Sequence, residues 1–234
     1  VERSRGLGDV YKRQDMAETR LTSLSVTGFR NYASCQLDIA ASNVLLLGPN
    51  GAGKTNLLEA ISMLAPGRGL RRARGEHLPY AAGGTRSWAV ASCISIADET
   101  YRIGTGVPAD SDTGQRIMRR DEETVSQSDI GRLFSASWIT PSMDGIFTDS
   151  PGTRRRFLDR QVIAFDAAHI GRTNRYEKML RERNALLAER RGDAAWFTAI
   201  EASLAAAAVA VTAARQSLIT DLNSEAGAGW HGFP

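Results

Sequence analysis

The sequence has little cysteine and histidine, and nothing in it suggests a disulfide framework or a metal site. Its 234 residues include two cysteines and three histidines. Cys35 and Cys93 lie far apart in segments of strand-like composition, so we interpret both as buried, reduced thiols. Two distant cysteines fit neither a disulfide-stapled scaffold nor the close cysteine spacing of a zinc finger.

Long apolar runs are also missing. The longest candidate, Leu204 to Ala214, is mostly alanine and falls short of the ~18 residues that a membrane helix needs. Val1 to Asp15 is charged and lacks the apolar core of a secretory signal. We therefore expect no membrane partner and a cytoplasmic location. We interpret residues 1–15 as a non-native or disordered leader, because the organised sequence begins just after Met16.

Neither sign of charge dominates the chain. The net charge is +3, and the apolar fraction of 42% and charged fraction of 24% are ordinary for a globular protein. This balance permits a nucleic-acid partner without requiring one. The length is sufficient for one or two domains with a real hydrophobic core.

One glycine-rich stretch carries the strongest functional signal. It fits G-x-x-x-x-G-K-[ST], the phosphate-binding loop of nucleoside triphosphatases. The apolar segment 43–47 before it predicts a short buried strand, and residues 56–64 after it predict a helix with one apolar face. Strand, loop and helix is the context that this motif requires. The loop consists of Gly48, Pro49, Asn50, Gly51, Ala52, Gly53, Lys54 and Thr55.

The residue types of this loop suit phosphate chemistry. Glycines let the backbone approach an anion without an intervening Cβ. Successive backbone N–H groups can then point at the phosphates, and the helix N-terminus adds its partial positive charge. We expect Lys54 to reach the β and γ phosphates and the Thr55 hydroxyl to ligate Mg²⁺.

Alternating apolar residues predict antiparallel strands around the loop. Residues 21–29 and 35–39 are predicted to form a hairpin, and residues 88–96 another with 100–103 as its partner. Arg116 to Met118 is predicted to return as a short strand. Residues 128–134 predict a short helix capped by Ser128, and 137–140 a further core strand. We expect an antiparallel subdomain beside a nucleotide-binding core.

The acidic pair Asp98-Glu99 follows an apolar strand, as the Mg²⁺-binding acids of many ATPases do. We favour a hairpin turn here, because the alternation of residues 92–96 suggests a sheet with one face exposed to solvent, whereas a central parallel strand is apolar on both faces. Strand character also resumes at Tyr101, too soon for a crossover helix.

A basic, glycine-rich loop spans residues 66–75. Its arginines could contact a phosphate backbone, or they could belong to a solvated surface loop, and both interpretations stay open. The candidates for DNA contact in this loop are Arg71, Arg72 and Arg74.

The second half of the chain predicts helices. Pro151 can open a helix, and Arg154, Arg155 and Arg156 follow within it as candidates for DNA contact or for inward ion pairs. Spacings of apolar residues predict two long helices, about residues 176–187 and 196–222, joined at Gly192-Asp193. Such a hairpin could be a projecting arm that packs on a partner or DNA, or a helical subdomain packed on its own core.

Three stretches together resemble the N-terminal part of the RecF family, within the SMC/Rad50-like class of ATP-binding cassette proteins. They are residues 24–32 with the sequence GFRNY, residues 48–61 with GKTNLLEAI, and residues 140–160 with RRRFLDR. Residues 176–187 agree more loosely. The resemblance spans about residues 20 to 190 and is far more specific than the phosphate-binding loop alone.

The resemblance implies an α/β fold: a P-loop NTPase head of the ATP-binding cassette type, with an antiparallel β subdomain and an inserted helical-hairpin arm. It implies ATP and Mg²⁺ as cofactors, with Arg30 and Asn31 lining the adenine or ribose side of the nucleotide. It also implies an ATP-closed homodimer on single-stranded, gapped or junction DNA, and work with recombination mediator proteins in repair, replication restart and the SOS response.

Similar proteins carry a signature motif and a Walker B strand ending in acids, and we find no convincing copy of either before Pro234. We therefore expect a chain truncated at its C-terminus, with no catalytic residues of its own and no activity alone, whose intact parent is an ATPase. The expected divisions are the leader 1–15, an ATP-binding lobe 16–150 and a helical arm 151–234.

Two other functions remain as alternatives. A P-loop small-molecule kinase would use Asp98 or Glu99 as a metal or base residue. A transporter-type nucleotide-binding subunit would require a membrane partner. The strands before the loop and the helical hairpin count against the first, and the stretches that resemble RecF count against the second.

Overall fold

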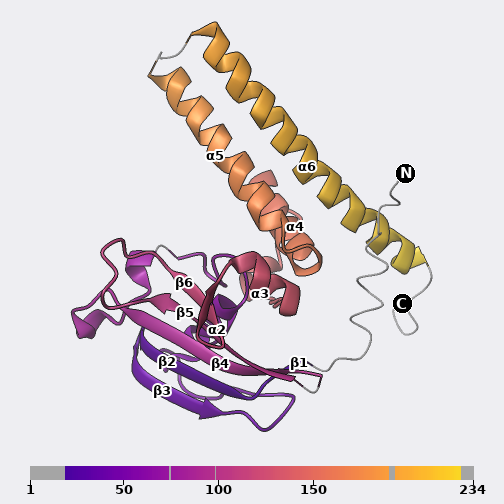
Figure 1. Ribbon diagram of the computed structural model, residues 1–234. Helices are drawn as coiled ribbons and strands as arrows, with labels where there is room; N and C mark the ends of the chain where they lie inside the picture. The colour runs from indigo at the N-terminus through magenta and orange to yellow at the C-terminus, as the bar shows by residue number, and fades with distance from the viewer. Residues whose placement is uncertain (1–18, 74, 98, 190–192, 228–234) are drawn as a thin grey trace. The chain divides into compact units, whose positions relative to one another are not determined.

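The computed structural model describes residues 19–73, 75–97, 99–189 and 193–227. These residues form two compact units, which we name the sheet unit (residues 19–138) and the helical unit (residues 139–227). Figure 1 shows the strands in one and the long helices in the other. The predicted leader, Arg74 and Asp98 lie outside the described residues.

The sheet unit is built on a seven-stranded sheet in which every pairing is antiparallel. The strand order is β3-β2-β4-β5-β6-β7, and β1 pairs with β4 beyond the end of β2. Both predicted hairpins are confirmed. The strands are β1 (Thr19–Leu21), β2 (Ser23–Phe29), β3 (Tyr32–Asp38), β4 (Trp88–Ile96), β5 (Glu99–Val107), β6 (Ile117–Arg120) and β7 (Glu123–Val125).

One face of the sheet is buried, as the alternation of its strands predicts. On β4 the side chains of Trp88, Val90 and Ile94 are buried, and Val26 of β2 lies opposite Val90. The rings of Trp88 and Phe29 pack with their centroids 5.4 Å apart at an interplanar angle of 58°. This tilted arrangement is one that aromatic pairs prefer.

Helix α2 (Lys54–Leu64) packs against β2, β4 and β5 and covers the core. Leu57, Ala60 and Leu64 are buried, whereas Leu58 of the same helix is 48% exposed. Helix α3 (Gln127–Leu133) is capped by Ser126, whose hydroxyl accepts from the Asp129 N–H, and the predicted cap Ser128 is wrong. The 3-10 helices are η1 (Gly75–His77), η2 (Ala81–Gly83) and η3 (Pro141–Met143).

The two predicted core strands that would lie outside this antiparallel sheet are not formed. Residues 43–47 and 137–140 belong to no strand of the described chain, and Leu45, Leu47 and Ile139 are 79%, 81% and 88% exposed. An extended segment is stable as a strand only when neighbouring strands pair with its N–H and C=O groups. The described residues provide no such neighbour here, so the apolar composition alone misled the prediction.

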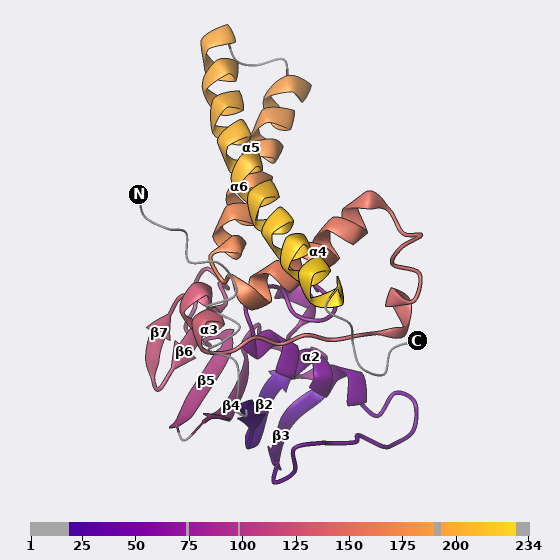
Figure 2. The same ribbon diagram turned by 90° about the vertical axis from the view of Figure 1, so that its right-hand side faces the viewer.

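The helical unit contains α4 (Pro151–Phe165), α5 (His169–Ala188) and α6 (Ala194–Gly227). Pro151 occupies the first turn of α4, as predicted, and Ser150 caps the helix. Helices α5 and α6 lie side by side as an antiparallel hairpin (Figures 1 and 2). At the start of α6 the Asp193 carboxylate accepts from the Trp196 N–H at 2.8 Å. The predicted helical hairpin is therefore confirmed, although Gly192 lies outside the described residues.

By length and composition, α6 could cross a membrane. This finding corrects the expectation that no segment has those properties, because alanine-rich turns raise the hydropathy of the whole helix without forming an unbroken run of large apolar residues. One such helix is weak support for a membrane span. Its Glu201 and Arg215 pair with Arg183 of α5 and Asp159 of α4, contacts made within the unit.

Candidate nucleotide-binding site

The glycine-rich loop leads directly into the first turn of α2. Gly53 has the left-handed φ of 99° that glycine adopts without strain, and its carbonyl accepts from the Asn56 and Leu57 N–H groups at 2.8 and 3.1 Å. Because the first N–H groups of a helix lack partners within the helix, those of Lys54 and Thr55 are suited to an anion.

The Lys54 side chain turns back over this loop. Its ammonium group donates to the Gly48 and Pro49 carbonyls at 2.6 and 2.8 Å. The loop backbone therefore holds a cation beside the N-terminus of α2, and both features attract phosphate oxygens. The Thr55 hydroxyl is exposed at the same helix end.

The turn between β2 and β3 packs on the loop. A Cβ on Gly53 would lie 2.5 Å from Asn31 Nδ2 and 2.6 Å from the Tyr32 hydroxyl, so these two side chains would have to shift to admit it. The left-handed φ of Gly53 is the stronger reason for glycine at this position, and the packing of Asn31 and Tyr32 adds to it. The Tyr32 hydroxyl donates weakly to the Ala52 carbonyl at 3.5 Å. Burial raises the pKa of Tyr32, and the nearby Cys35 raises it by a smaller amount.

Arg30 points away from the loop and toward the body of α2. Its Nε and Nη2 donate to the two carboxylate oxygens of Glu59 at 2.9 and 2.7 Å, and its Nη1 donates to the His77 carbonyl at 2.6 Å. Asn31, its neighbour, accepts from the Asn56 amide at 2.7 Å. The structure thus gives Arg30 a protein partner and leaves its expected nucleotide contact a prediction.

The basic loop is anchored on the same helix. Arg71 Nη1 donates to Asn56 Oδ1 at 2.6 Å and to Glu59 Oε2 at 3.0 Å. Farther along, the Leu70 N–H donates to the Ser62 hydroxyl at 2.7 Å. Arg72 adopts a left-handed φ of 52°. Arg71 is therefore part of an internal network, which favours neither of the two sequence-based interpretations outright.

Arg116 holds the other end of α2. Its guanidinium donates to the Met63 carbonyl, to the Gly67 carbonyl at 2.7 Å and to the Thr105 hydroxyl at 2.7 Å. Burial lowers the pKa of Arg116 to about 10. A cation at a helix C-terminus satisfies carbonyls that have no partner within the helix. Both ends of α2 are therefore fixed by arginines from other segments.

Glu99 of the acidic pair lies at the start of β5 in a β4–β5 hairpin, as the sequence favoured, whereas Asp98 lies outside the described residues. Ile96 pairs with Glu99 across the β4–β5 turn, so the two strands are antiparallel neighbours without a crossover. Glu99 accepts from the Tyr101 hydroxyl. Among the described residues there is no group of three or more His, Cys, Asp or Glu side chains that could hold a metal ion. Thr55 therefore remains the predicted metal ligand.

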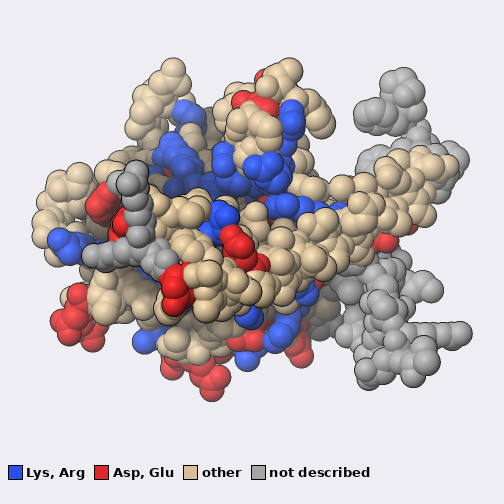
Figure 3. All heavy atoms as spheres, turned by 90° about the horizontal axis from the view of Figure 1, so that it is seen from above, with Lys and Arg blue, Asp and Glu red and all other residues tan. Residues whose placement is uncertain are grey.

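The arginines at the start of α4 are exposed. Arg154 donates to the Phe147 carbonyl at 3.1 Å, and Arg156 to the Thr153 hydroxyl at 2.9 Å. Arg155 is exposed beside them. Neither hydrogen bond is to a carboxylate, which favours an outward role over the inward ion pairs considered from the sequence. Figure 3 shows basic side chains in blue and acidic ones in red on one face of the molecule.

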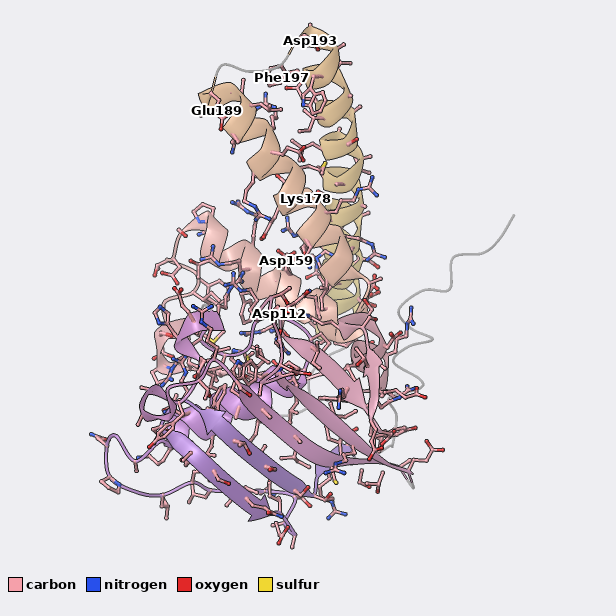
Figure 4. All side chains as sticks on the ribbon, turned by 60° about the vertical axis from the view of Figure 1, so that its left-hand side comes forward. Asp112, Asp159, Lys178, Glu189, Asp193 and Phe197 are labelled. Atoms are coloured by element: carbon pink, nitrogen blue, oxygen red, sulfur yellow. The ribbon has the colours of Figure 1, made fainter. Side chains whose placement is uncertain are left out.

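A second charged network, centred on Asp159, was not predicted. Asp159 of α4 accepts from His169 Nε2 at 2.9 Å and from Arg215 Nε and Nη2 at 2.7 and 2.8 Å. It therefore joins all three helices, and Figure 4 labels it on α4. Burial raises its pKa, but hydrogen bonds from His169 and Arg215 outweigh burial, so the net shift is downward. The hydrogen bond with Asp159 in turn raises the pKa of Arg215.

A glycine-rich loop followed by a helix that begins at the loop lysine matches two of the three parts of the P-loop nucleotide-binding motif, although the strand expected before the loop is not formed among the described residues. Comparison with protein families agrees, because the family described as "AAA domain" matches residues 23–150. The chain belongs to this AAA domain family.

Within that class, the chain is similar to proteins named DNA replication and repair protein RecF. The relative from Mesorhizobium japonicum is 44% identical over 208 residues, which are 87% of this chain and 54% of the relative. The relative from Caulobacter sp. is 41% identical over 225 residues, 90% of this chain and 57% of the relative. The resemblance to RecF is confirmed, and the chain spans about half the length of these curated relatives.

Solved structures share the fold. The "recombination mediator protein RecF-ATPrS in RecFOR pathway" matches with a TM-score of 0.77 and 24% identity, covering 88% of this chain and 56% of that one. The structure titled "RecF-ATP" matches with the same TM-score and 23% identity. The expected α/β fold of a P-loop head is confirmed.

Proposed function

We propose that this chain is the ATP-binding part of a DNA replication and repair protein. The observation that carries the proposal is the Lys54 ammonium, held by the Gly48 and Pro49 carbonyls at the N-terminus of α2. A triphosphate brings negative charge to this point, where the ammonium, backbone N–H groups and helix dipole all favour it. The similarity to proteins named RecF supports ATP as the nucleotide, since one solved structure of similar fold is described as RecF-ATP.

Mg²⁺ fits the same site as a companion of the phosphates. Thr55 offers one exposed hydroxyl. Mg²⁺ commonly keeps several water molecules and binds substrate phosphates, so one protein hydroxyl is a sufficient anchor. When bound, the ion would neutralise part of the phosphate charge.

DNA is the proposed second ligand. The exposed arginines 154–156 of α4 offer positive charge that can contact a phosphate backbone. Such contacts read shape and charge rather than sequence, as binding to single-stranded, gapped or junction DNA requires. Arg71, by contrast, is occupied by Asn56 and Glu59.

The remaining parts of the proposal rest on the relatives, whose names describe DNA replication and repair and recombination mediation. We infer an ATP-dependent homodimer that helps to load recombinase together with mediator proteins of the same pathway, in the cytoplasm and in the SOS response. We propose ATP binding for these residues and assign no step of ATP hydrolysis to them, since no convincing signature or Walker B motif is found before Pro234.

Replacing Lys54 by alanine tests the proposal. Loss of one charged donor should weaken ATP binding about 10- to 100-fold, since hydrogen bonds to charged groups contribute ~1.5–3 kcal/mol each. Isothermal titration with Mg²⁺ and ATP measures the affinity, and fluorescence anisotropy measures binding to gapped DNA with and without ATP. Lys178→Ala is the matched control, because Lys178 is an exposed lysine on α5. Unchanged ATP affinity and DNA binding in Lys54→Ala would refute the proposal.

A further inference from the structure

Glu59 is a buried carboxylate that phosphate binding does not use. It lies one turn after Thr55 on α2, and its side chain is 1% exposed. Three hydrogen bonds from two guanidinium groups, of Arg30 and Arg71, reach its oxygens at 2.7 to 3.0 Å. A buried carboxylate is costly unless it is paired in this way. Its burial on the core side of α2 therefore points to a role other than packing.

The two arginines come from segments that both border the phosphate-binding loop. Arg30 belongs to the β2–β3 turn, whose next residue, Asn31, packs on Gly53. Arg71 belongs to the basic loop and also donates to Asn56, which in turn donates to Asn31. The contacts form a closed ring around the first turns of α2. Glu59 is its one acidic member.

The backbone of both segments is held in conformations that side chains disfavour. Arg30 has a φ of 56°, and Arg72, next to Arg71, has a φ of 52°. Residues other than glycine adopt this left-handed region only when surrounding contacts hold them there. The bidentate pair of Arg30 with Glu59 and the pair of Arg71 with Glu59 are such contacts.

We propose that Glu59 is a positioning residue of the nucleotide site. Its carboxylate fixes the β2–β3 turn and the basic loop against α2, so that Asn31 and Asn56 keep the phosphate-binding loop in its binding conformation. The inference rests on the proposed ATP binding and adds a residue that acts through others. It also links the basic loop to the nucleotide site, because Arg71 contacts both Asn56 and Glu59.

Loss of this carboxylate should change ATP affinity in opposite directions, depending on whether Glu59 acts through its charge or by positioning its neighbours. Glu59 is a negative charge on the helix that begins at the loop, paired with Arg30 and Arg71, so its removal should strengthen the binding of an anion if only electrostatics mattered. If Glu59 positions the two segments, its removal should weaken ATP binding. The sign of the change therefore separates the two roles.

The experiment compares Glu59→Gln with Glu123→Gln, which removes the same charge from an exposed position on β7 of the same unit. We expect Glu59→Gln to bind ATP about tenfold more weakly at a temperature where its circular dichroism matches that of the wild type, and Glu123→Gln to bind as the wild type does. Without nucleotide, limited trypsin digestion should cut the basic loop several-fold faster in Glu59→Gln. Equal or tighter ATP binding together with unchanged cutting would overturn the proposal.

Arg71→Gln keeps the inference testable if Glu59→Gln does not fold. This variant removes the contacts of Arg71 with Glu59 and Asn56, at a side chain that is 41% exposed. It leaves the pair of Arg30 with Glu59 intact. We expect about threefold weaker ATP binding, and wild-type affinity would contradict the role. If the wild-type chain itself fails to bind ATP, the proposed function fails, and trypsin cutting of the basic loop alone then decides whether Glu59 positions it.

Discussion

The sheet unit and the helical unit bury their side chains in different ways. In the sheet unit, large side chains such as Phe29, Trp88 and Ile103 form one contiguous core between the sheet and α2. In the helical unit, buried apolar residues such as Val162, Val211 and Leu218 line a narrow seam, and the hydrogen bonds of Asp159 cross it. The first unit therefore gathers its buried apolar residues in one core, whereas in the second a charged network joins three helices along a thinner apolar seam.

This contrast explains why the two units suit different tasks. A contiguous core gives α2, and the loop that begins it, a close-packed support, and the side chains of Asn31 and Tyr32 pack on Gly53. A seam crossed by a few charged contacts is more sensitive to single substitutions of polar residues and to pH. The predictions below test whether the two units depend on these different forces.

Trp88→Ala should have the largest effect. Removing a fully buried indole from the centre of the sheet leaves a cavity, and such changes cost about 3–5 kcal/mol. Amide hydrogen exchange, followed segment by segment, should show lost protection in β4 and β5 while α5 and α6 keep theirs. Trp196→Ala, at a side chain that is 55% exposed on α6, is the control and should change stability by less than ~0.5 kcal/mol. Equal loss of protection in both units would show that they unfold together.

Asp159→Asn should have a smaller effect, confined to the helical unit. It removes the charge that His169 and Arg215 share, while keeping the volume. We expect a loss of about 2 kcal/mol, since hydrogen bonds to a charged group are involved. Helicity during urea unfolding measures the change. Glu177→Gln, which breaks an exposed pair with Arg181 at 3.6 Å, should be nearly neutral, and a similar loss there would mean that Asp159 has no special role.

Acid should act on the helical unit through the same residue. The net downward shift of the Asp159 pKa means that its contribution is fully present above the ordinary aspartate pKa of about 3.9. The contribution is then lost as the pH falls through the lowered value. Wild-type stability of α5 and α6 should therefore fall below about pH 4 more steeply than that of Asp159→Asn. Parallel acid profiles for the two proteins would contradict this assignment.

The sequence predicted the antiparallel hairpins and the helical hairpin because each is a local pattern. Alternation along residues 88–96 reports one buried sheet face, and the spacing of Ile200, Val211 and Leu218 reports one buried helix stripe. The phosphate-binding loop was predictable for a different reason. Its chemistry depends on consecutive residues, and Lys54 and Gly53 lie where the motif places them.

The errors arise where structure depends on distant partners. Residues 43–47 have strand composition, but strand formation depends on neighbours that composition does not reveal. The ring around Glu59 was missed because its partners lie 29 and 12 residues away in sequence. A glutamate among the apolar residues of a buried helix was the available signal, since such a charge requires cationic partners.

The exposed segment 43–47 has a consequence for the colloidal behaviour of the chain. It is short, apolar, uncharged and free of proline, and Leu45 and Leu47 are mostly exposed. Segments of this kind pair with copies of themselves, so concentrated solutions should cloud on warming before either unit melts. The residues that lead into the phosphate-binding loop would then also determine how fast the purified protein aggregates during storage.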